Sequence, residues 1–106
     1  MNRLIAVLFA AASLGALAAE GDIELVIEKH KFTPDRIEIP AGKKVRFVID
    51  NRDDTAEEFD SKDLKVEKVV PPKSKGVVFI GPLKPGEYKF IGEFNEKTAK
   101  GVVVAK

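Results

Sequence analysis

The 106-residue sequence contains no cysteine and no tryptophan, and His30 is its only histidine. Without cysteine, the chain forms no disulfide, thiolate zinc site, iron–sulfur cluster or cysteine nucleophile. A blue-copper centre is excluded for the same reason, because it needs one thiolate ligand. A Ser-His-Asp triad would have only one candidate base, and no G-x-S-x-G motif accompanies it.

The chain also lacks an excess of either charge, since 18 Lys and Arg residues face 17 Asp and Glu residues for a net charge of +1. A nucleic-acid partner is normally met by a basic excess, so this balance argues against one. A small domain without tryptophan offers little platform for a sugar, and no small organic substrate is evident. The apolar fraction of 44% is that of a globular protein.

The N-terminal segment has the pattern of a secretory signal peptide over residues 1–18. Arg3 precedes an apolar run from Leu4 to Ala12, and Ala16-Leu17-Ala18 forms a small-x-small cleavage site. The apolar stretch is shorter than the roughly 20 residues that span a bilayer, which favours a cleaved peptide over an anchor. We therefore expect a periplasmic protein with one domain over residues 19–106.

The remaining chain has the alternating apolar and polar pattern of short strands, separated by Pro and Gly turns such as Pro40-Ala41-Gly42 and Lys84-Pro85-Gly86. No segment keeps helical spacing for three turns, although Asp60 to Leu64 is compatible with a single helical turn. This pattern predicts an all-β Greek-key sandwich or barrel of about seven strands. The expected strands are residues 22–28, 36–39, 45–49, 66–70, 77–80, 88–91 and 102–105.

Tyr88, the only tyrosine, follows Leu83-x-Pro85-Gly86 at the start of an expected strand. A tyrosine in this position commonly turns its hydroxyl back to the chain at a Greek-key corner. We therefore predict a structural role for Tyr88.

Acidic residues gather in one segment, which we expect to be a loop at one end of the sandwich. Carboxylates bind hard cations and Fe(III) well and Cu(II) acceptably, so the segment is a candidate metal site. The alternative is a solvated acidic loop, which is what charge runs usually are. The acidic residues of the segment are Asp50, Asp53, Asp54, Glu57, Glu58 and Asp60.

Several motifs together resemble a known domain. The first half contains Phe32-Thr33-Pro34, Ile37-Glu38-Ile39-Pro40-Ala41-Gly42 and Val45-x-Phe47-x-x-x-Asn51. The second half contains Gly81-Pro82-Leu83-Lys84-Pro85-Gly86-x-Tyr88-x-Phe90, Gly92-Glu93-Phe94 and Thr98-Ala99-x-Gly101. Over residues 23–104 these motifs resemble a cupredoxin domain, which implies a Greek-key β-sandwich with loops clustered at a metal-bearing end.

Within that family, Glu57-Glu58-Phe59-Asp60-Ser61 and Gly92-Glu93-Phe94 resemble the cupredoxin-like domain of bacterial periplasmic iron-uptake proteins, the EfeO and FtrB kind. In electron-transfer cupredoxins the copper ligands are two His, one Cys and one Met. By the resemblance, Glu57 and Asn95 stand at the two His positions here, Gly92 stands at the Cys position and Ala99 at the Met position. The resemblance therefore implies that no blue-copper site is present, in agreement with the absence of cysteine.

Carboxylates remain at the metal-bearing end that the resemblance implies. Such an oxygen-rich site suits Cu(II) or Fe(III) and poorly suits Cu(I). His30, flanked by Lys29 and Lys31, is a weaker candidate because two cations disfavour a third. The candidate ligands are Glu57, Glu58, Glu67 and Glu93, with His30, Asp60 and Glu96 as secondary candidates.

Three functions follow from this reading. The first is a small periplasmic accessory in iron or copper uptake that binds a metal through loop carboxylates and serves an inner-membrane iron permease or a periplasmic iron-binding protein. The second is a metal-free cupredoxin-fold module that docks to such a partner. The third is a redox role. We expect no enzyme activity from this chain alone, so this role would take the form of a ferroxidase step that the chain shares with a partner.

Overall fold

The computed structural model describes residues 21–106, and the predicted signal peptide lies outside this part of the chain. The described residues form nine strands and one short 3₁₀ helix, η2, and none of their helices is long and apolar enough to cross a membrane. The elements are β2 (Asp22–Glu28), β3 (Lys31–Thr33), β4 (Arg36–Ile39), β5 (Val45–Asn51), β6 (Glu57–Ser61), β7 (Val66–Val70), β8 (Ser74–Ile80), β9 (Gly86–Gly92), η2 (Glu93–Asn95) and β10 (Lys100–Ala105).

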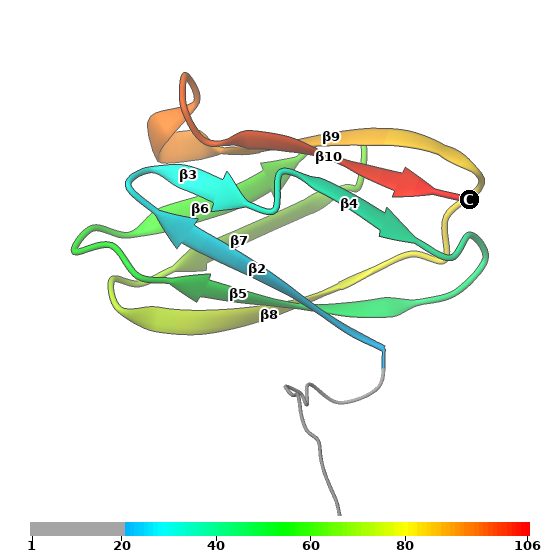
Figure 1. Cartoon of the computed structure of the whole chain (residues 1–106), viewed down its shortest axis with the longest axis horizontal. Coiled ribbons are helices and arrows are strands. Elements are labelled where there is room, and N and C mark those ends of the chain that lie inside the picture. The colour runs from blue at the N-terminus through cyan, green and yellow to red at the C-terminus, as the bar shows by residue number, and fades with distance from the viewer. Residues whose placement is uncertain (1–20) are drawn as a thin grey trace, which may run out of the picture.

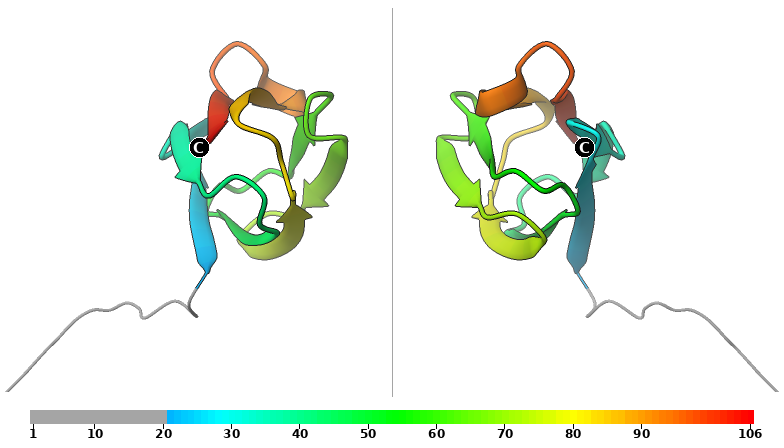
Figure 2. Two further views of the ribbon diagram at one scale, coloured as in Figure 1. Left: turned by 90° about the vertical axis from the view of Figure 1, so that its right-hand side faces the viewer. Right: turned by 90° about the vertical axis from the view of Figure 1, so that its left-hand side faces the viewer.

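Two sheets pack face to face as a sandwich (Figure 1). One sheet has the order β4-β10-β9-β6-β7, and the other has the order β3-β2-β5-β8. The pairs β2–β5 and β4–β10 are parallel, whereas the other pairs are antiparallel. Views along the long axis show the two layers enclosing one core (Figure 2). The predicted all-β sandwich is therefore confirmed.

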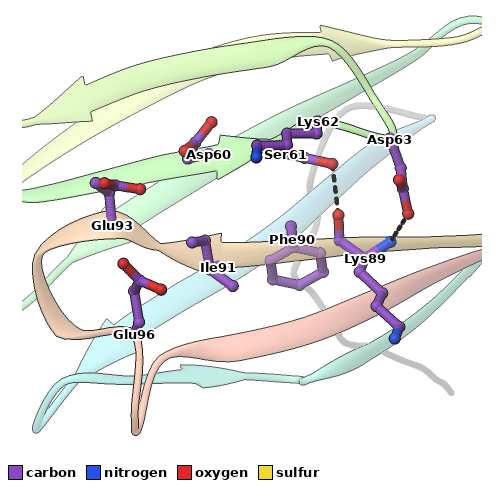
Figure 3. A pocket seen from close by; sticks show the side chains of 9 residues that line it. All are labelled: Asp60, Ser61, Lys62, Asp63, Lys89, Phe90, Ile91, Glu93 and Glu96. Atoms are coloured by element: carbon purple, nitrogen blue, oxygen red, sulfur yellow. Dashed lines mark hydrogen bonds between the residues drawn. The ribbon is translucent and has the colours of Figure 1, made fainter.

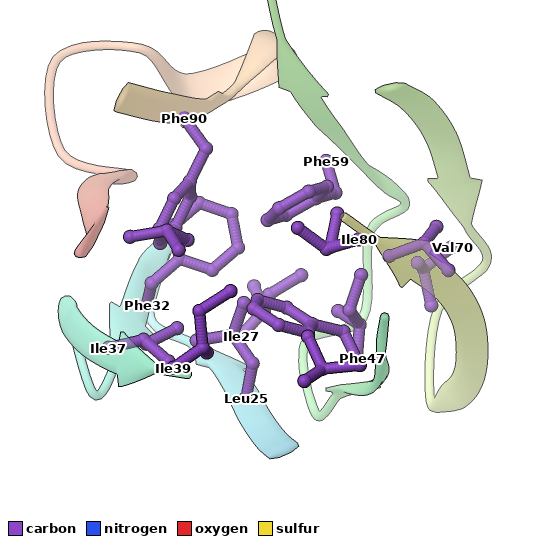
Figure 4. Packing of buried hydrophobic residues seen from close by; sticks show 14 of the residues in the cluster. Leu25, Ile27, Phe32, Ile37, Ile39, Phe47, Phe59, Val70, Ile80 and Phe90 are labelled. Atoms are coloured by element: carbon purple, nitrogen blue, oxygen red, sulfur yellow. The ribbon is translucent and has the colours of Figure 1, made fainter. Parts of the chain in front are cut away.

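The core is built by the period-two alternation of the strands. In β5, for example, Val45, Phe47, Ile49 and Asn51 are buried while the residues between them are partly exposed. Phenylalanine rings from both sheets meet at the centre (Figure 4), and the ring centroids of Phe32 from β3 and Phe90 from β9 are 5.0 Å apart. Burial of each such side chain contributes about 1.5–3 kcal/mol to stability.

The predicted number of strands was too low, because β3 and β6 were not recognised. β3 has only three residues, and β6 carries three carboxylates in its five positions, which hides its alternation from a hydrophobic pattern. The expectation that the acidic segment from Asp50 to Asp60 is a loop was therefore wrong for most of its length. A helical turn over Asp60 to Leu64 was also wrong, because Asp60 and Ser61 complete β6 and a tight turn leads to β7.

The predicted structural role of Tyr88 is confirmed. Its hydroxyl donates a 2.7 Å hydrogen bond to the carbonyl oxygen of Lys84, four residues earlier. The ring is partly buried and packs against the core cluster. The tyrosine thus fixes the corner at which the chain enters β9.

Asn51 connects three segments at the end of the sandwich where η2 lies. Its side chain is fully buried, and Nδ2 lies 2.9 Å from the carbonyl oxygen of Thr55 and 3.1 Å from those of Val70 and Pro71. Its Oδ1 accepts a hydrogen bond from the amide of Asp53. The loop before β6 and the turn after β7 are consequently held to the end of β5.

Candidate functional site

Glu57 is the most unusual residue at this end of the sandwich, because it is a carboxylate with only 1% of its surface exposed. Its Oε1 accepts hydrogen bonds from the backbone amides of Glu58 and Phe94, both at 2.9 Å. Its Oε2 accepts a 2.7 Å hydrogen bond from Nδ2 of Asn95. Every one of these partners is a donor, which is the environment an ionised carboxylate requires.

The four positions that correspond to copper ligands by resemblance come together around this carboxylate. Asn95 contacts Glu57 directly, and its carbonyl oxygen accepts a hydrogen bond from the amide of Ala99. The amide of Gly92 in turn donates to the carbonyl oxygen of Ala99 at 2.8 Å. A Cβ atom at Gly92 would lie 2.7 Å from both the Glu57 Cδ and the Ala99 Cβ. The Glu57 side chain therefore lies between the other three positions.

These residues do not fit the copper ion that the fold suggests. A blue-copper centre needs a thiolate and imidazole nitrogens, whereas the positions hold a carboxylate, a glycine, an amide and a methyl group. Both oxygens of Glu57 already accept hydrogen bonds from N–H groups of the chain, and the side chains of Gly92 and Ala99 offer no ligand atom. Hydrogen bonds thus join β6 to η2 at the place where a cupredoxin uses metal bonds.

The other candidate carboxylates point away from the core. Along β6, Glu57, Phe59 and Ser61 are buried, while Glu58 and Asp60 alternate with them and are partly exposed. Asp60 lies opposite Glu67 of β7, and Glu93 and Glu96 follow in and after η2. We name the outer surface formed by β6, β7 and η2 the acidic face; its carboxylates are Glu58, Asp60, Glu67, Glu93 and Glu96. Figure 3 shows Asp60, Glu93 and Glu96 side by side along a shallow hollow of about 480 Å³.

Carboxylates on the acidic face repel one another. A side-chain hydrogen bond with Asp60, then burial, then the charge of Glu96 raise the pKa of Glu93. Burial, followed by the charges of Glu67 and Asp60, raises the pKa of Glu58. Among residues 21–106, none of the five carboxylates forms an ion pair with a Lys, Arg or His side chain. The five carboxylates therefore have no salt-bridge partner within the described chain, although Lys62 and Lys89 line the same hollow as Asp60, Glu93 and Glu96.

The predicted metal ligands do not form one cluster. Glu57 faces the core, whereas Glu58, Glu67 and Glu93, with Asp60 and Glu96, belong to the acidic face. His30 lies in the exposed turn between β2 and β3, where its Nδ1 is 3.6 Å from an Asp53 oxygen. In the described part of the chain, no group of three or more His, Asp or Glu side chains could hold a metal ion as placed. Metal binding by these carboxylates stays a prediction.

Asp53 has a structural role that the sequence did not indicate. Its carboxylate accepts hydrogen bonds from the amides of Lys29 and His30, which both have positive φ angles in the tight turn. Burial acts to raise the pKa of Asp53, but these two hydrogen bonds and the charges of His30 and Lys73 outweigh it, so the pKa is lowered. The turn after β2 is thereby tied to the loop after β5.

Two residues of the site were missed as functional candidates. Phe94 is exposed by 53% although it is a large apolar residue, and Asn95 is the side-chain partner of Glu57. Both lie in Gly92-Glu93-Phe94-Asn95, a segment whose sequence alone reads as a polar loop. The resemblance indicated that Asn95 stands at a copper-ligand position, but it did not indicate that its side chain contacts Glu57.

The mutual fit of Glu57 and Gly92 gives a first prediction. We expect Gly92→Ala to destabilise the protein by about 1–3 kcal/mol, because its new methyl group overlaps the Glu57 carboxylate and the Ala99 methyl group. Glu57→Ala should cost about 3 kcal/mol, since buried N–H donors lose their acceptor. In the double variant the cost of Gly92→Ala should be smaller, because one of its two overlaps is gone.

Urea unfolding of the four proteins measures these free energies. The expected coupling between the two positions is about 0.5–3 kcal/mol. Strictly additive costs would show that the carboxylate does not occupy the space beside Gly92.

The repulsion on the acidic face gives a second prediction. Because the pKa values of Glu58 and Glu93 are raised by folding, the folded state binds more protons above the ordinary value of 4.5, and stability falls as pH rises through this window. The variant Glu58→Gln plus Glu93→Gln has no titrating carboxylate at these two positions, so its stability does not fall with pH for this reason. We expect it to be more stable than the wild type at pH 7 and to lose that advantage below pH 4.5.

Thermal unfolding from pH 3.5 to pH 7.5 tests the expectation. Glu24→Gln plus Glu28→Gln is the matched control, since it removes two exposed charges from β2 in the other sheet. An advantage of the acidic-face variant that stays constant with pH would contradict the assignment.

Known structures share this sandwich. The metal-binding domain of the Cu(I)-exporting P-type ATPase CopA of Streptococcus pneumoniae, with Cu(I), matches with a TM-score of 0.72 and 16% identity, covering 84% of this chain and 90% of that one. A copper-binding protein in its apo form matches with a TM-score of 0.71 and 22% identity, over 84% and 92% of the two chains. Auracyanin from Roseiflexus castenholzii matches with a TM-score of 0.67 and 14% identity, over 84% and 99%. At these identities the likeness shows the fold alone.

A curated relative is more similar in sequence. An uncharacterised protein of Rickettsia prowazekii (strain Madrid E) is 42% identical over 83 residues, which are 78% of this chain and 66% of that protein. The sequence profile of the cupredoxin-like domain matches residues 3–105. The chain therefore belongs to the cupredoxin-like domain family, and without a cysteine it forms no blue-copper site.

Proposed function

We propose that this protein is a periplasmic, non-enzymatic accessory of iron or copper uptake, which acts as a metal-free cupredoxin-fold docking module. The observation that carries this proposal is the buried Glu57 carboxylate, whose oxygens accept hydrogen bonds only from N–H groups of its own chain. Because these hydrogen bonds occupy the Glu57 carboxylate, the protein does not carry electrons through a metal bound there. Its fold remains available as a rigid body for binding a partner.

The resemblance to the EfeO and FtrB kind of iron-uptake protein supports the choice of pathway. The two segments that carry this resemblance, Glu57–Ser61 and Gly92–Phe94, pack against each other through Glu57 and Phe94. Copper is the metal of two structural neighbours, the CopA metal-binding domain with Cu(I) and the copper-binding protein in its apo form. The proposed partner is an inner-membrane iron permease or a periplasmic iron-binding protein.

A calorimetric titration tests the metal-free part of the proposal. The chelator-treated protein is titrated with Cu(II), with Mn(II) and with citrate-held Fe(III), and a copper-binding cupredoxin is the positive control. We expect no saturable heat from this protein, because both oxygens of its buried carboxylate already accept hydrogen bonds from the chain and no group of three or more described carboxylates is placed to hold a metal ion. Saturable binding of about one ion per chain, insensitive to changes on the acidic face, would refute the metal-free module.

Cation binding on the acidic face is a second candidate function, and the raised pKa values of Glu58 and Glu93 favour it. Burial raises the pKa of Glu58 and a hydrogen bond with Asp60 raises that of Glu93, and a bound cation would offset the further contribution that neighbouring carboxylates make to both. Fe(III) or Cu(II) held by Glu58, Glu67 and Glu93 would correspond to the sequence prediction without Glu57. In the same titration this candidate predicts saturable heat that Glu58→Gln plus Glu93→Gln abolishes and that Glu57→Gln leaves unchanged.

Co-purification tests the docking part of the proposal. We expect the tagged protein to retain the iron permease, or the iron-binding protein, when the membranes are solubilised and washed in the presence of EDTA. Retention in EDTA follows because no contact in the proposed complex passes through a metal. If EDTA released the partner and added metal restored the complex, the two proteins would be bridged by a metal ion. The metal-free docking proposal would then be wrong.

A further inference from the structure

Three large apolar side chains are exposed in the described part of the chain: Val69 by 50%, Phe79 by 56% and Phe94 by 53%. Phe79 lies on β8 in the other sheet, and the Lys44 ammonium group covers its ring at 5.2 Å from the centroid. Val69 is directly opposite Glu58 on the acidic face, and Phe94 follows Glu93 at the η2 edge of that face, where it also borders a hollow lined by His30 and Lys97. Two of the three exposed apolar residues thus neighbour carboxylates that form no ion pair within the described chain.

The backbone that carries Phe94 is held in place from inside the protein. Its amide donates to the buried Glu57 Oε1 at 2.9 Å, and the carbonyl oxygen of Asn95 accepts hydrogen bonds from the amides of Thr98 and Ala99. An apolar residue presented on a fixed backbone loses little conformational freedom when it binds a partner. The burial of Glu57 therefore serves to present Phe94 at the surface.

The charges around these apolar residues decide what kind of partner fits. Interfaces commonly have an apolar centre with a charged rim, and the potentials of the two partners are complementary. Here the apolar residues are Val69 and Phe94, together with the partly exposed Ile91 of β9, the strand between β6 and β10. The rim carries the five carboxylates of the acidic face, which outnumber the two lysines beside them, Lys62 and Lys89. A complementary surface is apolar at its centre and rich in Lys or Arg around it.

We infer that the acidic face, with Phe94 and Val69 as its apolar contacts, is the surface by which this protein docks to a basic protein partner. This inference rests on the proposed docking function and specifies its surface. The face is the unpaired outer side of a sheet in the described chain, and nothing else in residues 21–106 covers it. Electrostatic attraction would speed the encounter, while Phe94 and Val69 would slow dissociation.

Binding of defined peptides to the ¹⁵N-labelled full chain tests the surface by NMR. The probe is the amidated peptide Lys-Lys-Leu-Phe-Lys-Lys. Its controls are Glu-Glu-Leu-Phe-Glu-Glu, which reverses the charge, and Lys-Lys-Ser-Ser-Lys-Lys, which lacks apolar side chains. We expect the probe alone to shift the amide signals of residues 58–69 and 91–96, with an affinity that falls as salt is raised.

A matched pair of variants separates this face from the rest of the surface. Phe94→Ala should weaken probe binding about tenfold, whereas Phe79→Ala, which removes an equally exposed ring from the other sheet, should change it less than about twofold. Both residues are exposed, so both variants should fold. Glu58→Gln plus Glu93→Gln should also weaken binding and reduce its dependence on salt.

Three results would overturn the inference: no shift up to about 5 mM peptide, shifts centred on β8 with Phe79→Ala as the weakening variant, or equal binding of the charge-reversed peptide. Displacement of the probe by stoichiometric Mn(II) or Cu(II) would also overturn it and assign the face to a cation. These outcomes leave the EDTA co-purification intact, so a wrong surface is distinguishable from a wrong function.

Discussion

The buried carboxylate of Glu57 is the interaction on which the η2 end of this protein depends. Removing an ionised carboxylate from water costs several kcal/mol, and only well-placed donors offset that cost. Two backbone amides and the Asn95 side chain supply them, from β6 itself and from a segment up to 38 residues later. The same contacts require Gly92 to lack a side chain and determine how η2 closes the sandwich. A set of hydrogen bonds thereby joins segments that metal ligands join in copper-binding members of the fold.

One strand separates the two kinds of carboxylate chemistry in this molecule. The alternation of β6 turns Glu57 into the core and Glu58 and Asp60 toward solvent, so adjacent glutamates have opposite surroundings. The inward carboxylate accepts hydrogen bonds at both oxygens, and these bonds stabilise the fold. On the outward side, burial raises the pKa of Glu58 and a hydrogen bond with Asp60 raises that of Glu93, and the neighbouring carboxylates add to both shifts. Membership of the cupredoxin-like family therefore describes the scaffold, and the absence of cysteine shows that this scaffold carries no blue-copper site here.

The acidic content of β6 explains the main error in predicting the strands. Strand prediction relies on apolar residues at every second position, and β6 offers only Phe59 in that role because Glu57 and Ser61 occupy the other inward positions. A buried glutamate and a buried serine are rare enough that a hydrophobic pattern assigns them to a loop. Their burial depends on partners elsewhere: the Ser61 hydroxyl donates to the carbonyl oxygen of Lys89 in β9, and Glu57 is bound by η2. Pairing with β7 along its whole length, and with β9 at Phe59 and Asp60, makes this segment a strand.

Local pattern alone decides the all-β sandwich, the corner at Tyr88 and the impossibility of a blue-copper centre, because strand alternation, turn residues and the absence of cysteine are properties of neighbouring residues or of composition. The resemblance adds which positions have lost copper ligands. Which glutamate is buried, what Asn95 contacts and why Phe94 is exposed are decided only by the tertiary structure. The physical reason is that each depends on hydrogen bonds between β6 and η2, and their relative position follows from the pairing of β6 with β9 and not from any pattern along the chain.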